Sequence, residues 1–443
     1  METSGSSTVS TKLQRIAKLA KEAPTMVITS LSHHVDVEFL TEALAETRKG
    51  GAAGIDGITA KMYKQDLEAN LLSLLDCFKG GTYKAPPVRR VHIPKAGTDA
   101  TRPLGIPTYE DKVLQTAVKM LLENVYEQDF LPCSYGYRPG RSAHMALEQI
   151  WKATTDARNG WVIEADIRDF FGKLQHQHLR SFLDQRVRDG VIRRTIDKWL
   201  NAGVMEFEKL SYPEDGTPQG GVISPILANI YLHEVLDKWF EHEVKPCLKG
   251  RATLVRYADD FVCIFNREDD ARRVMAVLPK RFEKYGLSLH PDKTKLINFG
   301  RPSNNKSDDD NKDGTPRSFD FLGIHHFWGK SKKGNPCVKQ ATSRSRLRRA
   351  IGAITEWCRH NRHEPQRKQH ETLCSKIRGH YVYYGVTGNG RALYKFLRKT
   401  QDVWFKWLNR RSQKRGLTWA KFLTYLRTHS LPKPIMYASS LKP

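Results

Sequence analysis

The sequence is poor in cysteine, in acidic residues and in long apolar runs, and these shortages exclude several classes of protein. Its seven cysteines are odd in number and scattered, without a C-x-x-C pair, so they favour reduced thiols over a disulfide framework or a zinc site. No run approaches the roughly 20 apolar residues of a membrane-spanning helix, and the polar residues 1–10 lack the pattern of a signal peptide. We therefore expect a cytoplasmic protein with no membrane partner.

The shortage of acidic residues leaves a strong excess of positive charge. Against 73 Lys and Arg there are 48 Asp and Glu, which gives a formal net charge of +25. Residues 341–443 alone hold 23 Lys and Arg but only four acidic residues. A polyanion is therefore the expected partner, and nucleic acid is expected to bind to the last quarter of the chain. The 443 residues are enough for two or three domains and a sizeable core.

Apolar spacing and turn residues predict a mixed succession of helices and strands. Residues 83–107 predict a hairpin of two short strands. Helices are expected at 12–21, at the end of a polar tail, at 36–49, 111–128, 143–157, 173–210, 226–240 and 268–285, and as a set of three or four between 343 and 429.

Two adjacent carboxylates, Asp259 and Asp260, stand between apolar runs that are typical of buried strands. A tight turn would place both at the tip of a hairpin. A polar turn is the ordinary interpretation of such a pair, but burying ionised carboxylates is costly unless they are paired or bind a metal. Asp166 ends another apolar strand far upstream, and tertiary contact would bring three carboxylates together. That arrangement can hold two divalent cations for in-line phosphoryl transfer, and Mg²⁺ suits its oxygen ligands.

Three motifs follow one another along the chain and carry a family resemblance. They are Asp166-Ile-Arg-Asp-Phe-Phe, Thr217-Pro-Gln-Gly-Gly-Val-Ile-Ser-Pro and Tyr257-Ala-Asp-Asp. In this order they resemble a reverse transcriptase. The Gln-Gly-Gly-Val-Ile-Ser-Pro form is similar specifically to the group II intron-encoded reverse transcriptase/maturase family, and the resemblance covers roughly residues 30–430.

The resemblance implies an α+β fold, a right-hand polymerase with fingers, a palm with an antiparallel sheet, and an α-helical thumb/maturase domain. We expect no C-terminal DNA endonuclease, because the Cys pairs of that module are absent. The expected divisions are an N-terminal tail at 1–25, fingers with an N-terminal extension at 26–150, a palm at 151–326 with a flexible loop at 301–317, and a basic helical thumb/maturase domain at 327–443.

The resemblance also assigns residues to the site. The implied catalytic residues are Asp166, Asp259 and Asp260, which together with Ile167 would bind two Mg²⁺ ions, Mn²⁺ being the alternative ion. The residues implied to contact the incoming nucleotide are Lys95, Arg102, Phe171, Gln219 and Lys293. Arg102 and Lys95 would grip the triphosphate, Phe171 would pack under the sugar, and Lys293 would be a general acid. For Lys95, Arg102 and Lys293 an ordinary solvated cation is the alternative.

Further basic residues are expected to bind nucleic acid. Arg138 and Arg141 would touch the template backbone from their loop, or else be solvated there. In the thumb, the expected contacts come from Arg344, Arg346, Arg348, Arg349, Lys376 and Arg378.

The function implied is that of an RNA-directed DNA polymerase of a group II intron that also binds the intron RNA and assists splicing and retrotransposition. Its partners would be group II intron RNA, an RNA template with a DNA or RNA primer, dNTPs and target DNA, in a bacterial or archaeal cell. One departure favours an alternative: the family usually has Asp after the Phe pair, and here Gly172 stands. The alternatives are an RNA-binding splicing maturase with a vestigial polymerase core, and a host-co-opted CRISPR-associated or defence reverse transcriptase.

Overall fold

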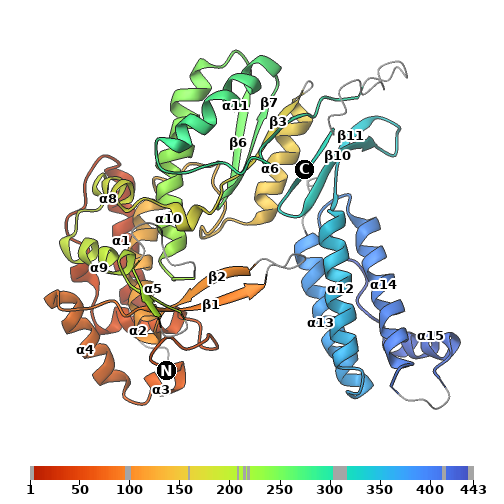
Figure 1. The fold of residues 1–443 in the computed structure, drawn as a ribbon, viewed down its shortest axis with the longest axis horizontal. Helices are drawn as coiled ribbons and strands as arrows, with labels where there is room; N and C mark the ends of the chain where they lie inside the picture. Colours follow the sequence, from red (N-terminus) through yellow and green to blue (C-terminus); the bar gives the residue numbers. More distant parts are fainter. Residues whose placement is uncertain are drawn as a thin grey trace.

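The computed structural model describes residues 4–94, 101–157, 160–206, 209–212, 216, 220–302, 317–411 and 416–437. The chain forms a mostly helical N-terminal part, a central sheet flanked by helices, and a C-terminal helical bundle (Figure 1). Two further sheets accompany the central one, the first in the N-terminal part and the second before the C-terminal bundle.

The N-terminal part is built around α5, most of whose residues are buried. Thr108 caps α5 by accepting a hydrogen bond from the Asp111 backbone N–H. The helices predicted at 36–49 and 111–128 are confirmed as α2 and α5. The helices of this part are α1 (Ser4–Glu22), the short 3₁₀ turn η1 (Ser32–His34), α2 (Val37–Glu46), α3 (Ala60–Tyr63), α4 (Leu67–Gly80), α5 (Tyr109–Tyr126), α8 (His176–Asp184) and α9 (Gly190–Leu200).

The helix predicted at 12–21 is confirmed as part of α1, but the chain before it is helical from Ser4 and does not form the predicted tail. Helix α1 begins at Ser4 and packs on α5, with Val9, Ile16 and Ala20 buried. Arg186 closes its C-terminal end by donating to the Ala20 carbonyl and to backbone carbonyls just beyond the helix, while it also pairs with an aspartate. The buried residues of α1 recur at helical spacing, but the other residues among the first ten are mostly polar and favoured the prediction of a tail.

The N-terminal sheet has the strand order β2-β1-β4-β5. Its β1–β2 hairpin is the one predicted within 83–107, and β4 joins it by parallel pairing to β1. The predicted helix at 173–210 is wrong at its end, because β4 occupies 204–206 and β5 begins at 209. The pairing of β4 with β1 depends on a distant segment that local spacing does not reveal. The strands are β1 (Val88–Pro94), β2 (Thr101–Ile106), β4 (Val204–Glu206) and β5 (Lys209–Ser211).

The central sheet has the order β6-β7-β3-β8, with every pair antiparallel. Successive residues of its strands face opposite sides: Ile163 packs in the core that contains α10 and α11, and Val162 packs with α6. The elements are α6 (Ala143–Asp156), β3 (Trp161–Asp166), α7 (Phe170–Lys173), α10 (Ser224–Leu232), which continues through η2 (His233–Asp237), η3 (Trp239–Val244) and η4 (Lys245–Cys247), then β6 (Ala252–Tyr257), β7 (Asp260–Phe265), α11 (Glu268–Glu283) and β8 (Lys295–Asn298).

A third sheet, β11-β10-β9, leads into the C-terminal bundle. The predicted division between 326 and 327 falls inside β10, and the one between 150 and 151 falls inside α6, so both predicted boundaries are misplaced. The bundle has its own core around Trp404 and Tyr381. The elements are β9 (Ser318–Phe321), β10 (Ile324–Lys330), β11 (Pro336–Thr342), α12 (Arg344–His360), α13 (Gln366–Tyr384), α14 (Gly390–Leu408) and α15 (Trp419–Thr428).

Candidate active site

The three predicted carboxylates meet at one end of the central sheet. Asp166, the last residue of β3, lies directly opposite Asp260, the first residue of β7. Asp259 lies in the two-residue turn between β6 and β7, which Tyr257 and Asp260 close as a pair. The predicted hairpin, and the predicted meeting of Asp166 with the Asp pair, are confirmed as geometry.

The turn that carries Asp259 is strained. Its first residue, Ala258, has φ 57°, a left-handed conformation that side chains other than glycine adopt at a cost of about 1–3 kcal/mol. Such a turn matches the twist of the two strands. It persists only where the surroundings hold it in place, and here they do.

Arg256, two residues before Ala258, provides this support from a fully buried position. Its Nε and Nη2 donate to the two carboxylate oxygens of Asp237 at 2.8 and 2.6 Å. Its remaining N–H groups donate to Asn229 Oδ1 at 2.9 Å, to Ser134 Oγ at 2.8 Å and to the Ala258 carbonyl at 3.1 Å. All five guanidinium donors are therefore satisfied, and one of them holds the strained turn.

The loop that contains Gly136 packs closely against the turn. A Cβ atom at Gly136 would collide with the backbone nitrogen of Ala258, so only glycine permits this approach. Asn229 holds the loop by donating to the Gly136 carbonyl at 2.8 Å. Arg256, Asn229 and Gly136 were not predicted as supports of the site. A charged residue inside an apolar strand run was the available signal for Arg256, because buried charge requires partners.

The carboxylates line a cleft of about 900 Å³ between the three parts of the molecule. Arg102 reaches it from β2, Lys293 from the loop before β8, and Arg346 and Arg349 from α12. Ile167 also lines the cleft with its side chain buried, so it offers its main chain. The cleft thus brings predicted residues from distant segments to one place.

The electrostatics of the site oppose the ionised carboxylates. Asp260 lies within the cleft where water reaches part of it; desolvation, then the charges of Asp259 and Asp166, raise its pKa to about 7. Desolvation and the charge of Asp166 likewise raise the pKa of Asp259, while Arg102 and Lys293 oppose that rise. A site of this kind favours added positive charge.

The donor set suits a hard divalent cation, because carboxylate and carbonyl oxygens are the ligands that Mg²⁺ prefers. In the conformation seen, Lys293 forms an ion pair with Asp166. Within the described ranges, no three acidic, histidine or cysteine side chains already surround a common point closely enough to hold an ion. The residues therefore fit the metal by chemistry and position, and closure around it requires side-chain rotation.

Two predicted nucleotide contacts, Lys95 and Gln219, lie outside the described residues. Phe170 is buried as predicted, and Phe171 is half-buried with its ring edge-on to Phe170 at 5.4 Å between centroids. Phe171 is not among the residues that line the cleft as described.

The segment after Asp166 explains how Gly172 is accommodated. Asp169 has φ 46°, again in the region that favours glycine, and it lines the cleft. A Cβ atom at residue 172 would lie 2.5 Å from a carboxylate oxygen of Asp169. The Asp169 side chain therefore occupies the space that a larger residue at 172 would use.

The prediction that Arg138 touches the template is wrong. Its side chain is 4% exposed and pairs in forked fashion with Glu127, with N–O distances of 2.9 to 3.1 Å. Its other donors bond to backbone carbonyls, so none is left for a phosphate. Arg138 instead ties its loop to the end of α5. Arg141 is half-buried over the Tyr135 ring at 5.6 Å.

The predicted nucleic-acid contacts of the bundle divide between two surfaces. Arg346 and Arg349 line the cleft. Tyr383 fixes the bundle beside it by donating a hydrogen bond to the Leu322 carbonyl at 2.9 Å. The other four predicted contacts are exposed and do not line the cleft: Arg344, Arg348, Lys376 and Arg378. The ammonium group of Lys376 lies 5.7 Å from the centre of the Trp357 ring.

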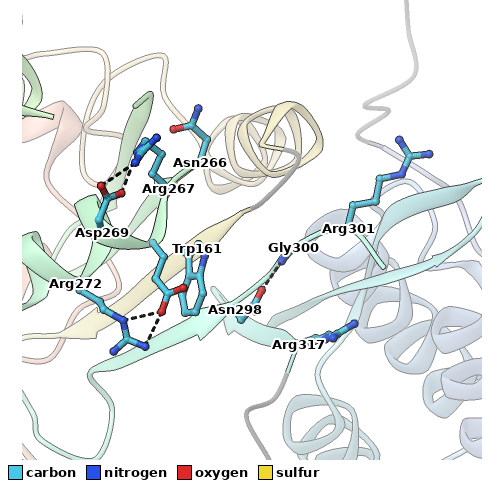
Figure 2. A pocket seen from close by; sticks show the side chains of 10 residues that line it. Trp161, Asn266, Arg267, Asp269, Arg272, Asn298, Gly300, Arg301 and Arg317 are labelled. Atoms are coloured by element: carbon cyan, nitrogen blue, oxygen red, sulfur yellow. Dashed lines mark hydrogen bonds and ion pairs between the residues drawn. The ribbon is translucent and has the colours of Figure 1, made fainter. Parts of the chain in front are cut away.

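A second hollow, of about 1000 Å³, lies at the opposite end of β3, beside Trp161 (Figure 2). Two of its arginines pair with acidic residues of α11: Arg267 with Asp269, and Arg272 with Glu268. It shares no residue with the carboxylate cleft and is separate from it.

Comparison with known proteins agrees with this geometry. Residues 93–326 match the family model described as reverse transcriptase (RNA-dependent DNA polymerase). The chain belongs to the reverse transcriptase family. Within this family it is 38% identical over 231 residues to the group II intron-encoded protein LtrA of Lactococcus lactis subsp. cremoris, which covers 51% of this chain and 38% of that protein.

Two further relatives of this reverse transcriptase extend the comparison. It is 34% identical over 290 residues to protein YkfC of Escherichia coli K12, covering 58% of this chain and 75% of that protein. It is 25% identical over 225 residues to the nuclear intron maturase 3, mitochondrial, of Arabidopsis thaliana, covering 44% and 31%. The chain thus spans well under half the length of LtrA. No helix within the described ranges is long and apolar enough to cross a membrane.

The support of the carboxylate turn predicts the effect of Arg256→Lys. Lysine keeps the charge but has only three donors, whereas the arginine uses five. Some of the acceptors around this fully buried position would therefore lose their hydrogen bonds. We expect a loss of about 3 kcal/mol in the free energy of unfolding, measured by denaturant titration. The double variant Arg256→Met/Asp237→Leu removes both charges and should lose less. A loss under 1 kcal/mol in Arg256→Lys would contradict the role of this arginine.

The pKa of Asp260 predicts a pH-dependent stability. Because its folded value of about 7 lies above the unfolded 3.8, the unfolded state binds fewer protons between these values, and stability falls as the pH rises through this window. Asp260→Asn removes that fall. Thermal melts should show its advantage over the native chain growing from pH 4 to pH 8, to about 1 kcal/mol given the partial access of water. A constant difference across this range would refute the prediction.

The crowding between Asp169 and residue 172 predicts a non-additive exchange. Gly172→Asp alone should destabilise the protein by about 1–2 kcal/mol, because the new side chain meets the Asp169 carboxylate. Asp169→Gly/Gly172→Asp should recover that loss, since glycine also relieves the left-handed backbone at 169. Thermal melts of both single variants and the double variant form the cycle. Additive effects would show that the two positions are independent.

Proposed function

We propose that the protein is an RNA-directed DNA polymerase of a group II intron that also binds intron RNA and assists splicing and retrotransposition. The observation that carries the proposal is the placement of Asp166 opposite Asp260, with Asp259 in the adjoining turn, inside a cleft that all three parts of the molecule line. Membership of the reverse transcriptase family and the likeness to LtrA support it.

In this proposal the parts of the fold take the roles of a right hand. The β1–β2 hairpin and its helices are the fingers, the central sheet is the palm, and α12 to α15 are the thumb and maturase domain. Arg346 and Arg349 would contact the backbone of the template–primer duplex, since arginine binds phosphate through paired donors. The substrates would be an RNA template, a DNA or RNA primer and dNTPs, with target DNA as a further partner.

Asp166, Asp259, Asp260 and the Ile167 main chain would hold two Mg²⁺ ions, with Mn²⁺ as the alternative. The chemistry that bound divalent cations supply is stabilisation of the charge that develops during phosphoryl transfer. Arg102, near Asp259 at the cleft edge, would bind the triphosphate. Lys293 would turn from Asp166 toward the leaving pyrophosphate and give it a proton.

The test is primer extension on an RNA template with dNTPs and Mg²⁺. The native chain should extend the primer, and Asp259→Ala should lose activity by about 1000-fold or more, because several kcal/mol of transition-state stabilisation disappear. The matched control is Asp269→Ala, which removes an exposed carboxylate of α11 outside the cleft.

The outcomes distinguish the candidate functions. Equal extension by Asp259→Ala and the native chain would refute the assigned carboxylate. Salt-sensitive RNA binding without extension by the native chain would replace the polymerase by a splicing maturase with a vestigial core, the function that Gly172 favours.

A further inference from the structure

Helix α14 has one face in the core of the bundle and another in solvent. The buried face carries Leu393, Phe396, Leu397, Thr400 and Trp404. In Figure 1 the helix lies on the side of the bundle that faces away from the β1–β2 hairpin. The exposed face is a stripe at helical spacing, which we call the α14 stripe: Arg391, Tyr394, Lys395, Arg398 and Lys399.

The α14 stripe lines a groove of about 600 Å³, and four of the seven residues that line it are cationic. The one acidic residue in its lining, Asp402, pairs with Lys399 at 3.2 Å. Within the described parts of the chain, Arg391, Lys395 and Arg398 have no ion pair or side-chain hydrogen bond. Three unneutralised cations along one groove attract a polyanion.

An exposed aromatic ring lies among these cations. Tyr394 is 56% exposed, whereas Tyr381 and Trp404 of the same bundle are fully buried. The C-terminal segment flanks the end of the groove, where a Cβ atom at Gly390 would lie 3.4 Å from Met436. A tyrosine left in solvent between cations is the combination that single-stranded nucleic acid uses, with bases on rings and phosphates on cations.

The spacing of the cations agrees with this use. At a rise of about 1.5 Å per residue, Arg391, Lys395 and Arg398 span about 10 Å of helix. They therefore follow one another along the groove, as contacts to neighbouring phosphates of one strand require. The groove shares no residue with the carboxylate cleft, so both can be filled together.

We propose that the α14 stripe is a second nucleic-acid site, which binds a single-stranded segment of RNA outside the polymerase cleft. Arg391, Lys395 and Arg398 contact successive phosphates, and Tyr394 stacks on a base. The choice of RNA rests on the proposed function, in which RNA is the template and the spliced partner. The site would hold the part of a long RNA that extends beyond the cleft.

The test measures binding of a labelled, unstructured RNA of about 20 nucleotides by fluorescence anisotropy, with the cleft filled by excess unlabelled RNA–DNA duplex. In Arg391→Ala/Lys395→Ala/Arg398→Ala, affinity should fall at least tenfold at low salt, and the slope of log affinity against log salt should decrease in magnitude by about 2. Tyr394→Ala should lose about tenfold, and Tyr394→Phe should retain binding.

The matched control is Arg272→Ala/Arg273→Ala/Lys280→Ala, which removes the same charge from the exposed face of α11. It should bind the RNA as the native chain does. Equal losses in both triple variants would show a general charge effect and overturn the proposal. Equal or tighter binding of a DNA strand of the same sequence would overturn the choice of RNA.

Primer extension on a short duplex separates this proposal from the proposed function. The α14 variants should extend such a primer at the native rate, because the cleft is unchanged. Native extension together with native RNA binding in the α14 variants would overturn the second site alone. Absence of extension by the native chain would instead count against the polymerase.

Discussion

The site depends on one buried ion pair, between Arg256 and Asp237. Asp259 lies in a tight turn whose first residue, Ala258, is left-handed, and a strained turn persists only where its surroundings hold it. The guanidinium group links that turn to the helix that follows the Gly-rich segment and to the loop before α6, through contacts with Asn229 and Ser134. The buried pair stabilises the fold only because every guanidinium donor has an acceptor. Removal of one partner would leave the other charge buried and unpaired, which is strongly destabilising.

The placement of charge follows from the same constraint. Carboxylates collected at one end of a sheet repel one another, and cations reach them from separate segments, namely Arg102 from β2 and Lys293 from the loop before β8. The buried Arg256 side chain thus supports the carboxylate turn from the protein interior, and the cations approach the carboxylates from the cleft. This division leaves the cleft able to accept a charged substrate without rearrangement of the central sheet.

Much of the site could be predicted from the sequence because its motifs are local. Asp166 and Asp259 each follow a short apolar strand, and their meeting required only that the strands pair. What could not be predicted depends on distant partners. In the sequence, Arg138 has the pattern of a solvated loop cation, and only the fold shows that it pairs with Glu127. Strand β4 likewise depends on its pairing with β1, which is distant in the sequence. Strand β11 also depends on a partner, because it is held by its pairing with β10.

The docking of α1 sets an order on the folding of the nascent chain. Its apolar face packs on α5, and its last carbonyls are closed by Arg186, a residue made long after the helix itself. At roughly 5–20 residues per second, the ribosome delivers that arginine about ten seconds or more after α1 has emerged. During this interval α1 can pack on α5, which is made earlier, but the carbonyl groups at its C-terminal end still lack the donors of Arg186. Completion of this part must therefore wait for synthesis to pass the start of the central sheet.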